Sequence, residues 1–327
     1  MSAGPTEMKY MASVAQALRD SMAADPRVIV MGEDIGAPGG SFKATRGLQE
    51  QFGPQRVLDT PISEAGIVSA AVGAALSGLR PVVEIMFMDF VTLAMDALVN
   101  QAAKARFMFG GQCSVPMVLR TPHGGGLSAG PQHSQCLEAW LAHVPGLKVV
   151  CAATPGDVYG LLRAAIRDPD PVIFIEHKNL YGSKGLVDVT AREVIGRAKT
   201  VRAGRDVTLV TYGATVHTAL LAAQELAREG IDVEVIDLRS LQPWDREAVL
   251  ASLARTHRAV IVHEAVQAFG VGAEIAATIA DEGFDELDAP VVRVGAPFMP
   301  VPFAKSLEQG YNVGTASIIK AVRRTLE

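Results

Sequence analysis

The segment DTPISEAGIVSAAVGAALSG, residues 59–78, places one carboxylate, Glu64, at the start of a long run of small and apolar residues. Ser63 precedes it as a candidate helix N-cap, and a helix dipole favours negative charge in the first turn. The following turns offer no polar face, so we expect this terminus to be buried. A buried carboxylate without a cation needs a hydrogen-bond donor or a proton. Glu64 is therefore a candidate acid or base, with a structural ion pair as the competing interpretation.

A second candidate is His133, which ends the glycine-rich segment TPHGGGLSAGPQH, residues 121–133. Loops at the edge of a sheet commonly carry function, and an imidazole can move protons near neutral pH. A lone histidine is also common as a structural residue. The role of His123 in the same segment stays open, and we expect structural roles for His143 and His263.

These candidates must be positioned by strands that are apolar throughout and alternate with helices. In the first half, we expect helices at 11–22, 65–76 and 90–104, from 134 and after 155, with strands RVIVMGED, RPVVEIMF, PMVLR, LKVVCAA and PVIFIEH. Strands of this kind are typical of a largely parallel sheet covered on both faces. We therefore predict a doubly wound domain over residues 1–182.

The pattern lapses into a polar stretch with scattered glycines, which predicts a linker over residues 183–205. It then resumes with the strands VTLVTYG, DVEVIDL, AVIVHE and PVVRVG and with helices at 216–228, 245–254, 272–280 and 318–326. The prediction is an α/β fold of two doubly wound, mostly parallel-sheet domains, the second one over residues 206–327.

Composition narrows the class of protein. The 327 residues are 49% hydrophobic and 20% charged, with a net charge of -5 and no block of Lys or Arg, so we expect neither nucleic acid nor an anionic membrane surface as a partner. The first residues show no signal-peptide pattern, and the longest apolar run is too short to span a bilayer, so we expect a cytoplasmic protein. The three cysteines have no metal spacing and are expected to be reduced and buried.

Several longer motifs carry a resemblance to a known family. The PISE stretch, with MGEDIG, TRGL, FGPQRVLDT, NQAAKARFMFGG, QHSQCLEAWLAHVPGLKVV, EHKNLYG and VPFAKSLE, resembles the beta subunits of thiamine-diphosphate-dependent pyruvate and acetoin dehydrogenases. The resemblance runs from about Tyr10 to the end of the chain. It implies a transketolase-type pyrimidine-binding domain followed by a transketolase C-terminal-type domain.

The resemblance also implies roles for individual residues. Glu64 matches the glutamate that hydrogen-bonds the aminopyrimidine N1′ of thiamine diphosphate and thereby promotes removal of the thiazolium proton. Phe90 matches an aromatic position in the segment that packs on the aminopyrimidine, and Met86 matches a neighbouring pocket position, with core packing as the alternative for Met86. His133 matches the histidine that assists reductive acylation of the lipoyl group. Glu84 has no role to carry over, and we expect it to form a structural ion pair.

A potassium ion, bound mainly by backbone carbonyls, is implied by the segment AAIRDPD. Oxygen ligands of this kind suit a hard cation. Relatives often have Asn where this chain has Asp170. By the resemblance, the ion would be surrounded by Met117, Ala165, Ile166, Asp168 and Asp170.

The 327 residues contain no Gly-Asp-Gly, the motif with which thiamine-diphosphate enzymes hold Mg²⁺ and the diphosphate. Half of the cofactor site is therefore expected on another chain. The implied partner is an alpha subunit, in a heterotetramer of two alpha and two beta chains, with a lipoyl acyltransferase core as the third partner and a small molecule as substrate.

Other functions stay open from the sequence. EIMFMDF and EHKNLYG resemble acetoin-dehydrogenase-type beta subunits more than the pyruvate type. This resemblance implies acetoin or pyruvate as substrate, with a branched-chain 2-oxo acid dehydrogenase as the alternative. A non-catalytic flavin or electron-transfer subunit could have the same fold, because fold does not fix function. A stand-alone transketolase-like enzyme would need its own Gly-Asp-Gly segment.

Overall fold

The computed structural model describes residues 4–327, which divide into two compact units. Unit 1 contains the residues up to His123 together with Trp140–Ile195, and unit 2 contains Gly124–Ala139 and Gly196–Glu327. The segment 124–139 thus belongs to unit 2, although it lies within the first domain predicted from the sequence. The predicted linker, residues 183–205, contains two short strands, β8 (Lys184–Val187) and β9 (Lys199–Arg202).

Unit 1 is built on a parallel sheet with the strand order β6-β7-β5-β4-β2-β3. Most residues of these strands are buried, as expected for strands covered on both faces. The strands are β2 (Val28–Gly32), β3 (Val57–Asp59), β4 (Arg80–Glu84), β5 (Val118–His123), β6 (Lys148–Cys151) and β7 (Val172–His177).

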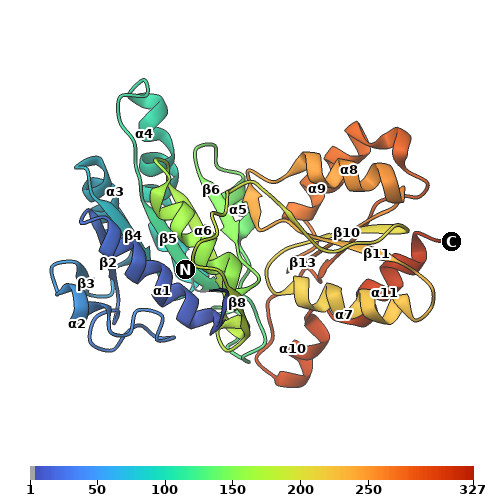
Figure 1. The fold of residues 1–327 in the computed structure, drawn as a ribbon, viewed down its shortest axis with the longest axis horizontal. Coiled ribbons are helices and arrows are strands. Elements are labelled where there is room, and N and C mark those ends of the chain that lie inside the picture. Colours follow the sequence, from blue (N-terminus) through green and yellow to red (C-terminus); the bar gives the residue numbers. More distant parts are fainter. Residues whose placement is uncertain (1–3) are drawn as a thin grey trace. The chain divides into compact units, whose positions relative to one another are not determined.

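Helices α1 and α6 pack against each other in unit 1, as Figure 1 shows, and β1 (Thr6–Lys9) pairs antiparallel with β8. The α-helices of unit 1 are α1 (Tyr10–Ala24), α2 (Leu48–Phe52), α3 (Glu64–Leu76), α4 (Ala103–Met108) and α6 (Pro155–Arg167). Helix α5 (Glu138–Ala142) begins in unit 2 and ends in unit 1. The helix predicted at 90–104 is wrong as one regular helix. It is replaced by a 3₁₀ helix over Met88–Ala94, a π-helix over Ala97–Ala102 and then α4.

Unit 2 has a second sheet with the order β14-β13-β10-β11-β9, parallel except for β9. Figure 1 shows α7 and α11 on one side of this sheet and α8 and α9 on the other. The strands are β10 (Val207–Thr211), β11 (Val233–Asp237), β12 (Ser240–Gln242), β13 (Ala259–Val266) and β14 (Val292–Ala296). The helices are α7 (Thr215–Ala227), α8 (Arg246–Thr256), α9 (Val271–Glu282), α10 (Lys305–Tyr311) and α11 (Thr315–Arg324).

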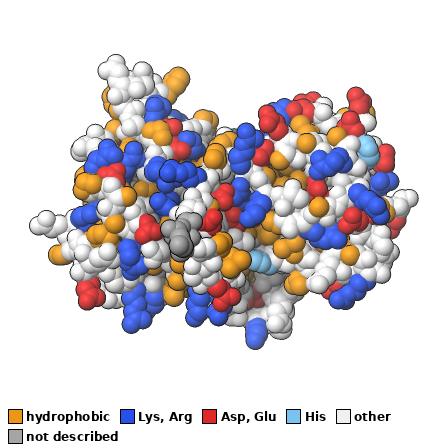
Figure 2. All heavy atoms as spheres, in the orientation of Figure 1, with side chains coloured by type: hydrophobic (Ala, Val, Ile, Leu, Met, Phe, Trp, Pro, Cys, Tyr) orange, Lys and Arg blue, Asp and Glu red, His pale blue; other side chains and the backbone are white. Residues whose placement is uncertain are grey.

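The predicted fold class, two α/β domains with mostly parallel sheets, is confirmed. Among residues 4–327, no helix is both long and apolar enough to cross a membrane. The surface in Figure 2 has Lys and Arg interspersed with Asp and Glu. The cysteines are free thiols, but burial was predicted for all three and holds only for Cys151, since Cys113 and Cys136 are half-buried.

Candidate active site

The carboxyl ends of β3, β2 and β4 lie side by side at one edge of the unit 1 sheet. The chain runs from β2 outward to β3 and then returns to β4 on the other side of β2. Such a reversal of strand order is a topological switch point, where open α/β sheets bind their ligands outside the carboxyl ends of the strands. The residues that directly follow these three strands are therefore the first place to look for a site.

Glu64 lies at this edge, as the first residue of α3 after β3. It is buried, with 8% of its surface exposed. Ser63 occupies the N-cap position, as predicted, although its side chain makes no capping hydrogen bond. Ser63 has an extended backbone with φ -164°, and its carbonyl accepts the first hydrogen bond of the helix from the N–H of Ile67 at 2.8 Å.

The carboxylate of Glu64 has neither a hydrogen-bond donor nor a cation as partner within residues 4–327. The amino end of α3 stabilises its negative charge, although only by a modest amount, about 0.3–1 kcal/mol. Burying an ionised carboxylate otherwise costs free energy unless a donor satisfies it. The arrangement is therefore suited to a ligand that brings its own donor.

Glu33 is a second acidic residue at this edge, which the sequence analysis did not single out. It follows β2 directly and is half-buried. Burial, the charge of Glu64 and the charge of Asp34 together raise the pKa of the Glu33 carboxyl. The available signal was a pair of acidic residues placed immediately after a buried strand. Glu33 adds negative potential next to Glu64 and favours a cationic or proton-donating ligand there.

Met86 and Phe90 follow β4 at the same edge, and both are half-buried. The ring of Phe90 meets the ring of Phe87 edge to face, with centroids 5.8 Å apart. Phe87 also contacts Phe42 edge to face at 5.8 Å. The switch point thus combines two carboxylates with an aromatic and thioether surface, a combination that suits a flat ring carrying hydrogen-bond donors.

Glu84, at the end of β4, forms the predicted structural ion pair. The Arg120 guanidinium donates to Glu84 at 2.8 Å and to both oxygens of Glu176, at 2.6 and 2.8 Å. Tyr181 donates its hydroxyl to Glu176 at 2.7 Å, and burial together with Glu176 raises the pKa of this tyrosine. Burial also raises the pKa of Glu84, against the opposing effect of Arg120. The prediction for Glu84 is confirmed.

His133 belongs to unit 2 and is half-buried, with its backbone N–H donating to the carbonyl of Gly130 at 3.3 Å. Its neighbours border a mainly apolar cavity of about 470 Å³ in the same unit. Ser134 contributes a buried hydroxyl that has no hydrogen-bond partner in the described part of the chain. The other lining residues include Pro131, Cys136, Phe298, Met299 and Tyr311.

The other histidines differ from His133 in their surroundings. His123 is buried, with its ring edge-on to His177 at 5.2 Å and its Nε2 3.9 Å from the sulfur of Cys151. His143 is exposed. His263 is buried, its Nδ1 lies 3.0 Å from the carbonyl of Ala265, and burial lowers its pKa. The structural role predicted for His263 agrees with this packing.

Comparison with known proteins identifies the family. Residues 6–184 match the family "Transketolase, pyrimidine binding domain", and residues 196–318 match "Transketolase, C-terminal domain". The chain belongs to the transketolase-like family of dehydrogenase beta subunits. The predicted resemblance is therefore confirmed, and the switch-point edge with Glu64 lies within the pyrimidine-binding part of this beta subunit.

Three relatives show the range of the family. The chain is 46% identical to the mitochondrial pyruvate dehydrogenase E1 component subunit beta-2 of Oryza sativa subsp. japonica, over 99% of this chain and 87% of the relative. It is also 46% identical to the acetoin:2,6-dichlorophenolindophenol oxidoreductase subunit beta of Cupriavidus necator, over 96% of each. The 2-oxoisovalerate dehydrogenase subunit beta of Bacillus subtilis is 42% identical, over 98% of this chain and 99% of the relative.

A solved structure gives the same fold. A split gene transketolase, described as an inactive beta4 tetramer, superimposes with a TM-score of 0.81 over 98% of both chains. At 23% sequence identity, this likeness concerns the fold alone.

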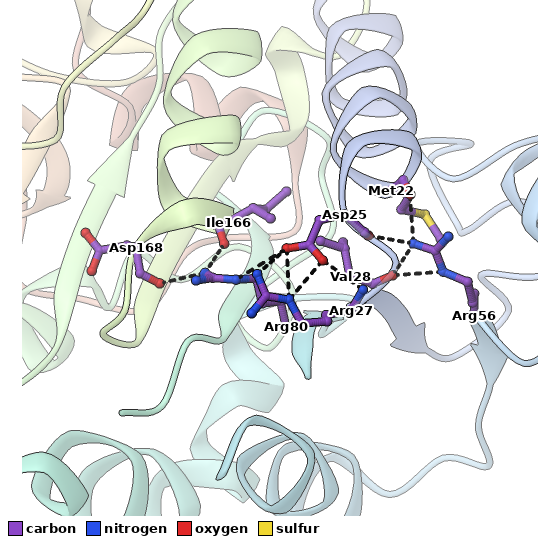
Figure 3. Close-up of polar contacts among 8 residues, drawn as sticks. All are labelled: Met22, Asp25, Arg27, Val28, Arg56, Arg80, Ile166 and Asp168. Atoms are coloured by element: carbon purple, nitrogen blue, oxygen red, sulfur yellow. Dashed lines mark hydrogen bonds and ion pairs between the residues drawn. The ribbon is translucent and has the colours of Figure 1, made fainter. Parts of the chain in front are cut away.

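Of the residues implied as potassium ligands in this beta subunit, Ile166 and Asp168 lie at the carboxyl end of α6 (Figure 3). Arg80 donates to the carbonyl of Ile166 at 2.8 Å and to that of Asp168 at 3.2 Å. The carboxylate of Asp168 pairs with Lys148 at 2.7 Å, and that of Asp170 pairs with Arg106 at 2.5 Å. Cationic side chains of the chain thus already contact the oxygens of Ile166, Asp168 and Asp170. Oxygens in this arrangement suit a cation.

Proposed function

We propose that this chain is the beta subunit of a thiamine-diphosphate-dependent pyruvate or acetoin dehydrogenase. With an alpha subunit, it would decarboxylate a 2-oxo acid, or cleave the C–C bond of acetoin, and acylate a lipoyl group reductively. The observation that carries the proposal is the buried, unpartnered carboxylate of Glu64 at the switch point of the pyrimidine-binding unit. The names of two relatives, a pyruvate dehydrogenase E1 component subunit beta and an acetoin:2,6-dichlorophenolindophenol oxidoreductase subunit beta, support it.

Glu64 would hold the aminopyrimidine by accepting a hydrogen bond from a ring nitrogen. A carboxylate at that point favours a proton on the ring nitrogen, and a proton-transfer group positioned in this way typically contributes about 10²–10⁴-fold to a rate. Glu33 would strengthen the preference, because its charge lies in the same region. Thiamine diphosphate, when bound, supplies the carbon nucleophile that these side chains alone do not provide.

Met86 and Phe90 would line the cofactor pocket. Both follow β4 and are half-buried, and the edge-to-face contact between Phe87 and Phe90 restrains the Phe90 ring. An apolar wall of this kind excludes water from the carboxylate and strengthens its hydrogen bond to a ligand.

His133 would hold or deliver a proton at a sulfur of the lipoyl group as the acyl group is transferred. Its position after a glycine-rich loop next to a mainly apolar cavity agrees with a route for an extended, largely apolar arm. An imidazole is suited to this step because its ordinary pKa lies close to neutral pH.

The partners belong to the same proposal. An alpha subunit would hold the diphosphate and Mg²⁺, since these 327 residues contain no Gly-Asp-Gly. We propose two alpha and two beta chains, with a lipoyl acyltransferase core as the acceptor. The relatives' names, which call both of them beta subunits, support an alpha partner.

The potassium site is proposed on oxygen chemistry alone. A carbonyl has two lone pairs, so donation from Arg80 leaves a lone pair on the carbonyls of Ile166 and Asp168. Comparing the thermal unfolding of the chain in KCl and in NaCl at equal ionic strength tests the proposal. Equal unfolding temperatures in the two salts would contradict a specific potassium site.

The substrate is proposed as pyruvate or acetoin, with branched-chain 2-oxo acids as the second candidate. Identities of 46%, 46% and 42% to relatives named for these three activities do not separate them. Rates of the reconstituted complex with pyruvate, acetoin and 2-oxoisovalerate would decide.

The test of the function uses Glu64→Gln, which keeps the size of the side chain and removes its charge. In the complex with the alpha subunit and saturating thiamine diphosphate, we expect deuterium exchange at the thiazolium carbon to slow by at least about a hundredfold. Glu50→Gln is the matched control, because Glu50 is exposed in the same unit. If Glu64→Gln exchanges as fast as the wild type, Glu64 is only a charge at a helix terminus.

A further inference from the structure

The segment that precedes His133 has an unusual backbone. Alternate residues of this loop have positive φ angles: Gly124 at 91°, Gly126 at 94°, Ser128 at 54° and Gly130 at 77°. Left-handed residues set between ordinary ones turn successive backbone N–H groups toward the same side, which forms a concave site for an anion. Glycine adopts this conformation without steric cost, whereas Ser128 needs contacts that hold it there.

Two carboxylates from distant parts of unit 2 occupy this concave face. Glu308, in α10, accepts hydrogen bonds from the N–H of Gly126 at 2.7 Å and from the N–H of Ser128 at 2.9 Å. Each of its two oxygens takes one of these bonds. Glu264, in β13, accepts from the N–H of Gly125 at 2.7 Å. Three amides in four consecutive residues therefore donate to two carboxylates.

These contacts are stronger than ordinary loop contacts. Glu308 is buried, with 2% of its surface exposed, and bonds from N–H groups to a buried carboxylate are charge-assisted. Close packing also restricts the conformation of the loop. A Cβ atom at Gly125 would lie 3.1 Å from Asn312 Oδ1, and a Cβ atom at Gly130 would clash with the ring of Phe303. The contacts with Glu308 in α10 therefore hold the backbone of the loop in one conformation.

We infer that Glu308, assisted by Glu264, is a positioning residue for His133. Glu308 fixes Ser128, Ser128 is two residues from Gly130, and the carbonyl of Gly130 accepts the N–H of His133. The inference deepens the proposed function and rests on it for the role of His133. Displacing a reacting group by about 1 Å can cost roughly a hundredfold in rate, so a loop fixed in this way affects catalysis without touching the substrate.

The first experiment follows the loop itself, independently of activity. In the alpha–beta complex, Glu308→Gln removes the charge and leaves one acceptor oxygen for two N–H groups. We expect the amides of Gly126 and Ser128 to exchange hydrogen about 10- to 100-fold faster, as for the loss of hydrogen bonds to a charged group. Glu274→Gln, at an exposed glutamate of α9 in the same unit, is the matched control. Unchanged exchange in Glu308→Gln would overturn the inference, whatever the complex catalyses.

The second experiment tests the link to His133. We expect Glu308→Gln to lower lipoyl acylation by about 10- to 100-fold while largely sparing turnover with an artificial electron acceptor. Glu308→Asp, which keeps both acceptor oxygens, should recover part of the rate. In the double variant with His133→Ala, the loss should be no larger than for His133→Ala alone, because both changes act through one residue. Losses that multiply, or that are equal in both assays, would overturn the inference.

Discussion

Glu64, Glu84 and Glu308 are three buried carboxylates with three different environments. Glu84 is paired with the guanidinium of Arg120, and Glu308 is bound by backbone N–H groups of its own chain. Glu64 has neither kind of partner in the described part of the chain. Burial alone therefore does not mark a functional carboxylate. The missing partner distinguishes Glu64, and a missing partner is visible only once the surrounding elements have been placed.

The coupling of Glu33 to Glu64 gives a pH-dependent prediction. Burial, Glu64 and Asp34 raise the pKa of Glu33 above its ordinary value of 4.5. A carboxyl of this kind contributes stability that is fully present below about pH 4.5 and is lost as the pH rises through the folded-state pKa. Glu64→Gln removes one of the causes, so we expect the pKa of Glu33 to fall. NMR titration of the labelled carboxyl carbons measures it, and an unchanged value would contradict the coupling.

His133 gives a prediction about the division of activity. We expect His133→Ala to leave cofactor binding intact and to impair acyl transfer to the lipoyl group more than turnover with an artificial electron acceptor. The physical reason is that a general acid or base acts only on the step whose proton it moves. Both rates are measured on one preparation of the complex. A parallel loss in both assays would place the residue earlier in the reaction or in folding.

Regular elements followed the hydrophobic pattern well, because long amphipathic helices and buried parallel strands have distinct periods. The region after β4 did not. The 3₁₀ helix there has fewer residues per turn than an α-helix, and the π-helix has more. The spacing of apolar residues averaged over 90–104 therefore still resembles that of one α-helix. Helices α2 and α10, five and seven residues long, were missed because they are too short to show a period. The elements that hold the candidate cofactor site were thus predicted, and their irregular continuation was not.

The loop that carries His133 shows a different limit of sequence analysis. Its position was predicted from the glycines, but its conformation depends on Glu264 and Glu308, which are 139 and 182 residues away from the amides they bind. A local pattern contains no information about such partners. The grouping of residues 124–139 with unit 2 could not be predicted for the same reason.

The end of α1 gives a prediction at the scale of elements (Figure 3). Arg56 donates to the carbonyls of Met22, Asp25 and Val28, at 2.9, 3.0 and 2.7 Å, where the helix passes into β2. We expect Arg56→Ala to lower the free energy of unfolding by about 1.5–3 kcal/mol, since carbonyls at a helix terminus lose a charged donor. Denaturant unfolding of the chain measures it. Arg27→Ala is the control, because Arg27 forms an exposed pair with Asp25, and an equal loss there would contradict the explanation.

Glu64 and His133 belong to different compact units, so one chain carries two parts of the proposed chemistry. At the scale of the whole molecule, these 327 residues contain no Gly-Asp-Gly, and we propose that the alpha subunit holds the diphosphate. We therefore expect the purified chain to bind thiamine diphosphate weakly or not at all and to show no decarboxylation. Adding the alpha subunit should restore both. Calorimetry with the chain alone and with the pair tests this, and turnover by the chain alone would refute the division of the site.

The Glu84–Arg120–Glu176 cluster also has an evolutionary consequence. Replacing one member leaves the others as buried charges without a partner, which lowers the free energy of unfolding by about 3–5 kcal/mol. A whole domain typically has a free energy of unfolding of only about 5–15 kcal/mol. An apolar replacement of similar volume can be as stable as the ion pairs, but only when all members change together. Each single substitution at these positions is therefore expected to lower the stability of the fold so far that it is selected against. We expect a lineage to keep the triad unchanged, with Tyr181 beside it, or to exchange it as a block, so that its members covary across descendants.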